Sequence, residues 1–202
     1  MTDFVKEYRE LYKEYEVNDH ENEFIVGLIK LKNIAEKEKV DDWSTCFQGR
    51  LAQFKDSYSE ALEKYERIID LYRDATDIEK RILSSWALAG KGFILNIVGK
   101  NYESIEICDK IFKRYGKDDE LELKRISAWS LLQKGCCKGN LGELDESIKT
   151  FEEIEKRYKY NNAPELQRTV ALALQNKGIA LEKLNKPEKA LETYLRNCPY
   201  LS

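Results

Sequence analysis

The sequence predicts an all-α protein, built as a solenoid of stacked helix pairs. The first observation is a repeat of 43 residues, a period that is typical of stacked repeat proteins. Two columns show it, one of glycines (Gly49, Gly92, Gly135, Gly178) and one that holds every tryptophan (Trp43, Trp86, Trp129, continued by Leu172). The second observation is that the chain of 202 residues contains only 3 prolines, as expected for a nearly all-helical chain.

The first helix of each repeat, helix A, is expected to begin at a capping residue sixteen positions before the glycine. A glutamate follows each cap by three residues, which is the spacing of a capping box. The caps are Asn33, Thr76, Asp119 and Asn162, and the glutamates are Glu36, Glu79, Glu122 and Glu165. Residues that tolerate a left-handed backbone should end the helix, so helix A is about 22 residues long. They are Asp56, Gly99, Gly142 and Asn185.

The second helix, helix B, follows after a tight turn and carries one apolar stripe. Its first column holds small residues (Ala61, Ser104, Ser147, Ala190), and a later one is mostly aromatic (Tyr65, Cys108, Phe151, Tyr194). Glycine inside a helix costs about 0.5–1 kcal/mol relative to alanine. Its recurrence in helix A therefore predicts that helices A and B approach closely at the glycine and at the small column.

Residues 3–16 and 23–38 are predicted to form two further helices, separated by a polar break at 17–22. We expect residues 1–40 to be an N-terminal helical cap or a degenerate repeat, because the end unit of a solenoid lacks a neighbour. Residues 41–202 are then one continuous array of about four repeats. One conflict stays open, since the capping column starts a helix at Asn33 whereas Val40-Asp41-Asp42 offers a later break.

At the other end, helix B of the fourth repeat should stop near Arg196, before the final residues 197–202. No further helix covers its apolar stripe, which includes Leu191, Tyr194 and Leu195. An uncovered apolar end favours self-association or a partner.

Together these columns resemble the tetratricopeptide repeat family. The match includes glycine at position zero, a turn residue at +7, a small residue at +12 and aromatic residues at +16 and +23, and it is clearest over 176–191. The family's usual unit has 34 residues, so the chain looks like its long bacterial variety, with the resemblance covering 33–201. Ala52 and Lys138 depart from the apolar +3 position, and the proline after helix B is absent. The resemblance implies a right-handed superhelical solenoid of antiparallel helix pairs.

In the family, ligands lie on the concave side that helix A lines. Carried over residue by residue, the strongest candidates are Arg50, Trp86, Ala89, Phe93, Asn96, Trp129, Leu132, Cys136, Gln175 and Ile179. The wider set adds Trp43, Cys46, Gln53, Gly139, Leu172 and Glu182. The centre of this groove is mostly apolar, which suits an apolar or amphipathic peptide or helix.

Three points refine this groove. The tryptophan column could belong either to the packing between repeats or to the groove. Phe93 is a better binding candidate, because its equivalents Arg50, Cys136 and Ile179 vary widely. The branch of the family that grips a C-terminal carboxylate has asparagine at this position, so binding of chaperone tails is not expected.

Lysines precede three of the four glycines, at Lys91, Lys134 and Lys177. They could form a cationic ladder for an acidic ligand, or they could lie on a solvated helix flank with their stems over apolar neighbours. The second interpretation is the more common one for such residues.

Composition argues against several other functions. The net charge of −3 gives no basic excess for nucleic acid, and no apolar run approaches the ~20 residues of a membrane span. The N-terminus does not resemble a signal peptide. The five cysteines are odd in number and have no CxxC spacing, which favours packed thiols in a reducing cytoplasm.

Catalysis has little support. His20 is the only histidine, and neither a nucleophile–base pair nor metal-ligand spacing is present in the sequence. We therefore expect no enzyme, no cofactor and no metal site. The predicted function is a protein–protein interaction module or scaffold that binds a peptide or helix of a partner in its groove. The alternative is an intracellular sensor that binds a small peptide or metabolite and changes its superhelical pitch.

Overall fold

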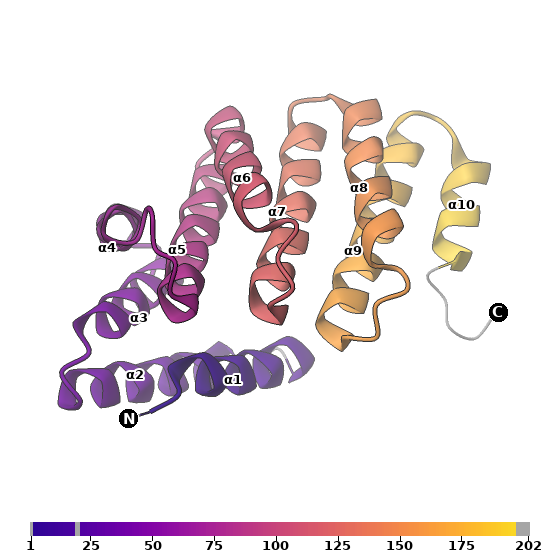
Figure 1. The fold of residues 1–202 in the computed structure, drawn as a ribbon. Coiled ribbons are helices and arrows are strands. Elements are labelled where there is room, and N and C mark those ends of the chain that lie inside the picture. Colours follow the sequence, from indigo (N-terminus) through magenta and orange to yellow (C-terminus); the bar gives the residue numbers. More distant parts are fainter. Residues whose placement is uncertain (1, 19–20, 197–202) are drawn as a thin grey trace. The chain divides into compact units, whose positions relative to one another are not determined.

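The computed structural model describes residues 2–18 and 21–196. These residues form ten α-helices and no strand, which confirms the all-α class (Figure 1). The chain divides into two compact units, Met1–Ile94 and Leu95–Ser202. The boundary falls inside one long helix, so each unit is described separately.

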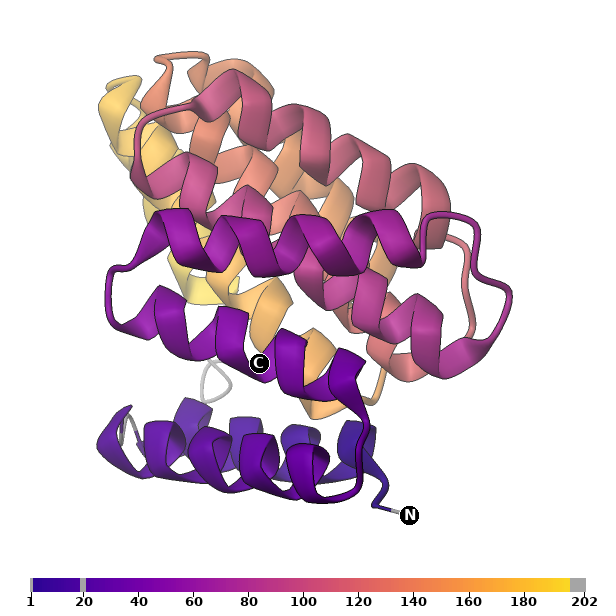
Figure 2. The same cartoon turned by 90° about the vertical axis from the view of Figure 1, so that its left-hand side faces the viewer.

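The first unit contains α1 (Phe4–Asn18), α2 (Glu21–Lys37), α3 (Asp41–Phe54), α4 (Tyr58–Leu71) and most of α5 (Ile78–Ile97). From α1 to α4, each helix packs against the next one along the chain. Helices α1 and α2 lie side by side (Figure 2). They are close because Gly27 has no side chain: a Cβ there would stand 2.3 Å from Leu11 Cδ1. The two predicted N-terminal helices are confirmed. The predicted break at 17–22 is too long, because α1 continues to Asn18 and α2 begins at Glu21, while residues 19–20 lie outside the described residues.

The second unit contains the end of α5, then α6 (Asn101–Tyr115), α7 (Leu121–Asn140), α8 (Leu144–Tyr158), α9 (Pro164–Lys183) and α10 (Pro187–Arg196). From α6 onward each helix packs against the next, and α7 also packs against α9. A core cluster joins α7, α8 and α9, with Phe151, Ile154 and Leu166 almost fully buried. Odd-numbered helices from α3 to α9 correspond to helix A of the repeat, and even-numbered helices from α4 to α10 correspond to helix B.

The turn column is confirmed at all four positions. Asp56, Gly99, Gly142 and Asn185 have φ values of 55°, 79°, 81° and 57°. Each of these left-handed residues follows the end of a helix A. The predicted length of helix A is close, since α5, α7 and α9 each contain 20 residues. Helix α3 has only 14 because it begins at Asp41.

The capping column is wrong in the first repeat, where Asn33 lies inside α2. The buried positions Leu28, Leu31 and Ala35 continue the helical spacing past it, so burial sustains the helix. The later break is the correct one. Lys39 adopts a φ of 58°, and α3 starts after Val40.

In the other three repeats, the helix begins one residue later than the capping column predicts. The Asp77 carboxylate accepts a hydrogen bond from Lys80 N at 3.1 Å at the start of α5. Glu120 caps α7, accepting from Leu123 N at 3.1 Å. Ala163 precedes α9, and Asn161 Oδ1 accepts from its amide at 2.9 Å. The sequence therefore located these helix starts but not the side chains that cap them.

The close approach of helices A and B is confirmed. A Cβ added to Gly49, Gly135 or Gly178 would stand 2.9, 2.4 or 2.1 Å from the aromatic ring sixteen residues later. These rings belong to Tyr65, Phe151 and Tyr194. The small column is buried as well, from 0% exposed at Ala61 and Ser104 to 1% at Ser147 and Ala190.

Candidate functional site

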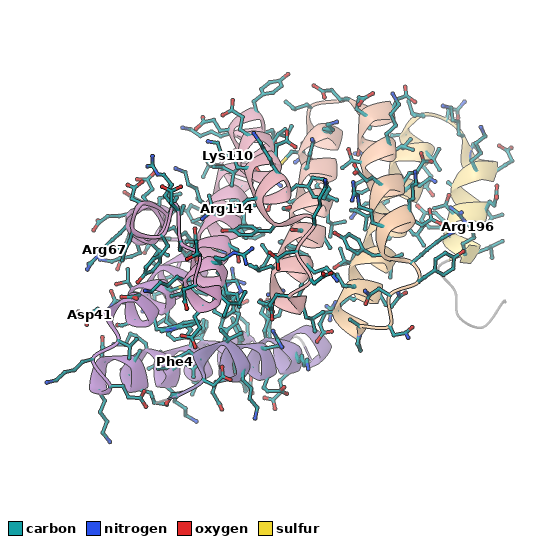
Figure 3. All side chains as sticks on the ribbon, in the orientation of Figure 1. Phe4, Asp41, Arg67, Lys110, Arg114 and Arg196 are labelled. Atoms are coloured by element: carbon teal, nitrogen blue, oxygen red, sulfur yellow. The ribbon has the colours of Figure 1, made fainter. Side chains whose placement is uncertain are left out.

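Helix α1 covers the helix-A residues of the first unit. Phe4, labelled in Figure 3, lies 5.4 Å from the Trp43 ring and 5.9 Å from the Phe47 ring. Tyr8 lies 4.2 Å from the ring of Trp86, and the two tryptophan rings are 5.6 Å apart. Trp43 is 4% exposed and Trp86 8%. In the first unit the tryptophan column is therefore core, and α1 supplies part of its cover.

Arg50 lies in the same region, one position after its repeat glycine. Tyr65 reaches it because two glycines, Gly49 on α3 and Gly90 on α5, leave room for the ring: a Cβ on Gly90 would stand 2.5 Å from Tyr65 Cζ. Gln53 Oε1 then accepts from the Tyr65 hydroxyl at 2.9 Å and from Arg50 Nη1 at 3.2 Å. Gly90 lies outside the glycine column, so the 43-residue period could not reveal its role.

Burial disfavours the charged form of Arg50 and acts to lower its pKa. The effects of Tyr8, Tyr65 and Tyr12 favour the charged form and are larger in sum, so the pKa of Arg50 is raised above its usual value. The guanidinium is therefore always charged. Burial raises the pKa of Tyr65, with Arg50 opposing the shift, so this phenol stays protonated. Burial also raises the pKa of Cys46 to about 12, with Arg50 again opposing.

The other candidates in the α5 part of the predicted groove are only partly buried. Ala89 and Phe93 belong to the first unit, and Asn96 to the second. Asn96 Oδ1 accepts a hydrogen bond from Asn140 Nδ2 at 3.2 Å. Asn140 is the last residue of α7, and this contact joins the ends of two helix-A segments within the second unit.

The second unit presents the equivalent positions of α7 and α9 differently. We call this surface the α7–α9 face; its residues are Trp129, Cys136, Leu172, Gln175, Ile179 and Glu182. Trp129, Cys136 and Leu172 pack against the core cluster while they remain partly exposed. Ile179 is 40% exposed, and Gln175 and Glu182 are exposed too. Leu132, another predicted groove residue, is 5% exposed and belongs to the core. The face therefore combines a half-buried apolar strip with an exposed isoleucine.

The predicted lysine ladder is neutralised by carboxylates. Each lysine on a helix A forms an ion pair with an acid on the preceding helix B, twenty-five residues earlier. The pairs are Lys91–Glu66 at 2.9 Å, Lys134–Asp109 at 2.5 Å and Lys177–Glu152 at 2.7 Å. The acids also recur every 43 residues, a signal in the sequence that could have revealed the pairing. These ion pairs argue against a site for an acidic ligand at the three lysines, and the burial of Lys177 shows that the flank is not fully solvated.

The four cysteines within the described residues show no sign of activation. Cys46, Cys108, Cys136 and Cys137 are free thiols, whereas Cys198 lies outside the described residues. Burial raises the pKa of Cys136 to about 11, with Cys137 adding to the shift. Burial raises the pKa of Cys108 and Cys137 as well. Thiols with raised pKa are poor nucleophiles and poor metal ligands at neutral pH.

The described residues contain neither a metal-binding cluster nor a membrane-spanning helix. None of their histidine, cysteine, aspartate and glutamate side chains gather in a group of three that could hold a metal ion. None of their helices has the length and apolar character needed to cross a membrane. Comparisons with models of protein families, with curated proteins and with solved structures found no match.

Proposed function

We propose that the chain is a tetratricopeptide-like protein-interaction module, and that its α7–α9 face binds an amphipathic helix of a partner protein. The observation that carries this proposal is α1, which is itself an amphipathic helix lying on helix-A residues. Its side chains Phe4 and Tyr8 meet Trp43 and Trp86. A helix with aromatic residues four apart is thus a ligand that this repeat surface accommodates within one chain.

The α7–α9 face offers similar chemistry at equivalent repeat positions. Trp129 stands where Trp43 and Trp86 stand in the earlier repeats. Cys136 and Leu172 extend the apolar strip, and Ile179 is exposed at 40%. Binding of an apolar helix face would remove this area from water, which is the main favourable term in helix-in-groove recognition. Rigid packed helices also lose little entropy on binding.

The test is capture of proteins from a lysate of the source organism by the native chain and by two variants. Ile179→Asp places a charge on the α7–α9 face, and the control Tyr102→Asp places one on α6, where Tyr102 is 66% exposed. We expect a partner that the native chain and the control retain and that Ile179→Asp loses, with circular dichroism unchanged.

Capture by all three proteins alike would place binding elsewhere and refute this use of the face. If Ile179→Asp alone loses the partner, the amphipathic helix of that partner should be tested for binding as a synthetic peptide. A peptide that binds the native chain at least tenfold more tightly than Ile179→Asp would correspond to about 1.4 kcal/mol of interaction.

A further inference from the structure

Arg50 is a cation in a shell of uncharged groups. The Phe54 ring centroid lies 5.2 Å from its Cζ atom, and Gln53 Oε1 accepts from Nη1 at 3.2 Å. Its electrostatic neighbours include Tyr8, Tyr12 and Tyr65, which come from α1 and α4. The Nε atom is buried and has no hydrogen-bond partner. In the described part of the chain, Arg50 has no ion pair with a carboxylate.

Two other sheltered cations of the described residues are paired with carboxylates. Arg125, with its side chain 14% exposed, forms a 2.5 Å ion pair with Glu122. Lys177, 11% exposed, pairs with Glu152 at 2.7 Å. Arg50 differs from these two cations because no carboxylate pairs with it in the described part of the chain.

An unpaired charge held away from water is costly, and it is usually compensated by a partner or a ligand. The guanidinium presents its donors in a planar fork that matches a carboxylate through two parallel hydrogen bonds. In Arg50, Nη1 already donates to Gln53, and the buried Nε proton is the donor that lacks an acceptor. A carboxylate at the Nε edge would supply both the missing acceptor and the missing charge.

We infer that Arg50 anchors a binding site for a carboxylate carried on an aromatic or apolar body. A single negative charge balances the single guanidinium, whereas a phosphate dianion would leave an excess charge among aromatic rings. The rings of Phe54, Tyr8 and Tyr12 offer apolar contact to the body of the ligand. Arg50 and Tyr12 are both partly exposed, so these two side chains can be reached from solvent.

Binding of a ligand at Arg50 should be detectable through the residues that surround it. Tyr8 is shared between Arg50 and Trp86, whose ring lies 4.2 Å from it. A ligand that neutralises Arg50 should therefore stabilise the packing of α1 against α3 and change the tryptophan fluorescence. This inference does not depend on the proposed docking of a partner helix, because it rests on the first unit alone.

The experiment uses the full chain and three probes: phenylacetate, its uncharged analogue phenylacetamide, and inorganic phosphate. Each is titrated while the melting temperature and the tryptophan fluorescence are recorded. The expected result is a saturable response and a higher melting temperature with phenylacetate, with neither effect from phenylacetamide. Absence of a saturable response to phenylacetate would overturn the inference. A response to phosphate alone would overturn the carboxylate assignment.

Two variants connect the response to the guanidinium. Arg50→Met keeps the length of the side chain and removes its charge, and the control Arg73→Met removes an exposed arginine that pairs with Asp70. We expect phenylacetate affinity to fall at least about tenfold in Arg50→Met and to persist in the control.

An Arg50→Met chain that binds phenylacetate as well as the native chain does would refute the inference. Should that variant fail to fold, Arg50→Lys decides the question. Lysine keeps the charge and loses the planar fork, so it should weaken phenylacetate binding while the fold is retained. Unchanged binding by a folded Arg50→Lys protein would show that the Nε edge is not the site.

Discussion

Gly135 offers a sharp test of the packing between helices A and B. An alanine Cβ at this position would stand 2.4 Å from Phe151 Cε1, whereas ordinary contacts begin near 3.4 Å. The ring must therefore retreat by about 1 Å, yet Phe151 is 2% exposed and belongs to the core cluster. Overpacking of this kind costs about 1–3 kcal/mol. Alanine regains about 0.5–1 kcal/mol of helix propensity, so the net loss of stability in Gly135→Ala should be about 1 kcal/mol at the middle of the two ranges and about 2.5 kcal/mol at most.

The matched control lies on the same helix. A Cβ on Gly139 would meet only Ser147 Oγ at 3.4 Å, which is ordinary contact. Gly139→Ala should therefore be neutral or stabilising by up to about 1 kcal/mol. Urea unfolding followed by circular dichroism gives both free energies. For a chain of this size Gly135→Ala should lower the melting temperature by a few degrees, and by about 10 °C at most. Equal or greater stability of Gly135→Ala would refute the close-approach explanation of the glycine column.

Three further predictions concern charge, pH and assembly. Lys177→Met should lower the free energy of unfolding by at most about 1 kcal/mol, because its partner Glu152 is half exposed, and this loss should shrink at high salt. A larger loss in urea unfolding that does not depend on salt would contradict this prediction. Burial raises the pKa of Cys46 from 9.0 to about 12, so the stability that this thiol contributes is fully present below pH 9 and is lost as the pH rises toward 12. Cys46→Ala should therefore flatten the fall in unfolding free energy between about pH 8 and about pH 10.5. An unchanged slope would exclude this thiol as a cause of that fall. Leu191 and Leu195 are 59% and 47% exposed on α10, so sedimentation of the native chain should show concentration-dependent self-association that a double change to glutamate removes; a native chain that stays monomeric at high concentration would refute it.

Much of the local structure could be predicted from the repeat. The left-handed turn residues follow from side-chain type, because glycine, asparagine and aspartate tolerate positive φ at low cost. The contacts between the glycines of helix A and the aromatic rings of helix B follow from the 43-residue period. A residue that recurs at this spacing meets an equivalent neighbour in each repeat. Leu191 and Leu195 belong to the apolar stripe that the sequence predicted on this helix, and both are exposed.

Cap residues were harder to predict. At the start of α7 the cap is Glu120 rather than Asp119, and Glu122 forms an ion pair with Arg125. Several neighbouring side chains can satisfy the same orphan amides, so the choice depends on small differences in backbone geometry. The prediction that a helix begins at Asn33 was wrong for a different reason. Burial of Ala35 continues α2 past this residue and outweighs the local capping signal.

The candidate site was predicted only in part. The positions on helix A were identified, yet Trp86 and Leu132 are buried, whereas Ile179 is exposed. The shell around Arg50 could not be foreseen, because Tyr8 and Tyr12 belong to α1, which lies outside the 43-residue period.

The sequence by itself determined the repeat, the turns and the pairing of helices A and B, because each depends on neighbours at a constant separation along the chain. Only the tertiary structure decided that α1 lies on α3 and α5, and that the lysines meet carboxylates on the preceding helix. Burial of an apolar stripe is favourable against many surfaces, since the hydrophobic effect has no direction. The stripe of α1 therefore predicted that the helix would be buried, and the packed structure determined where.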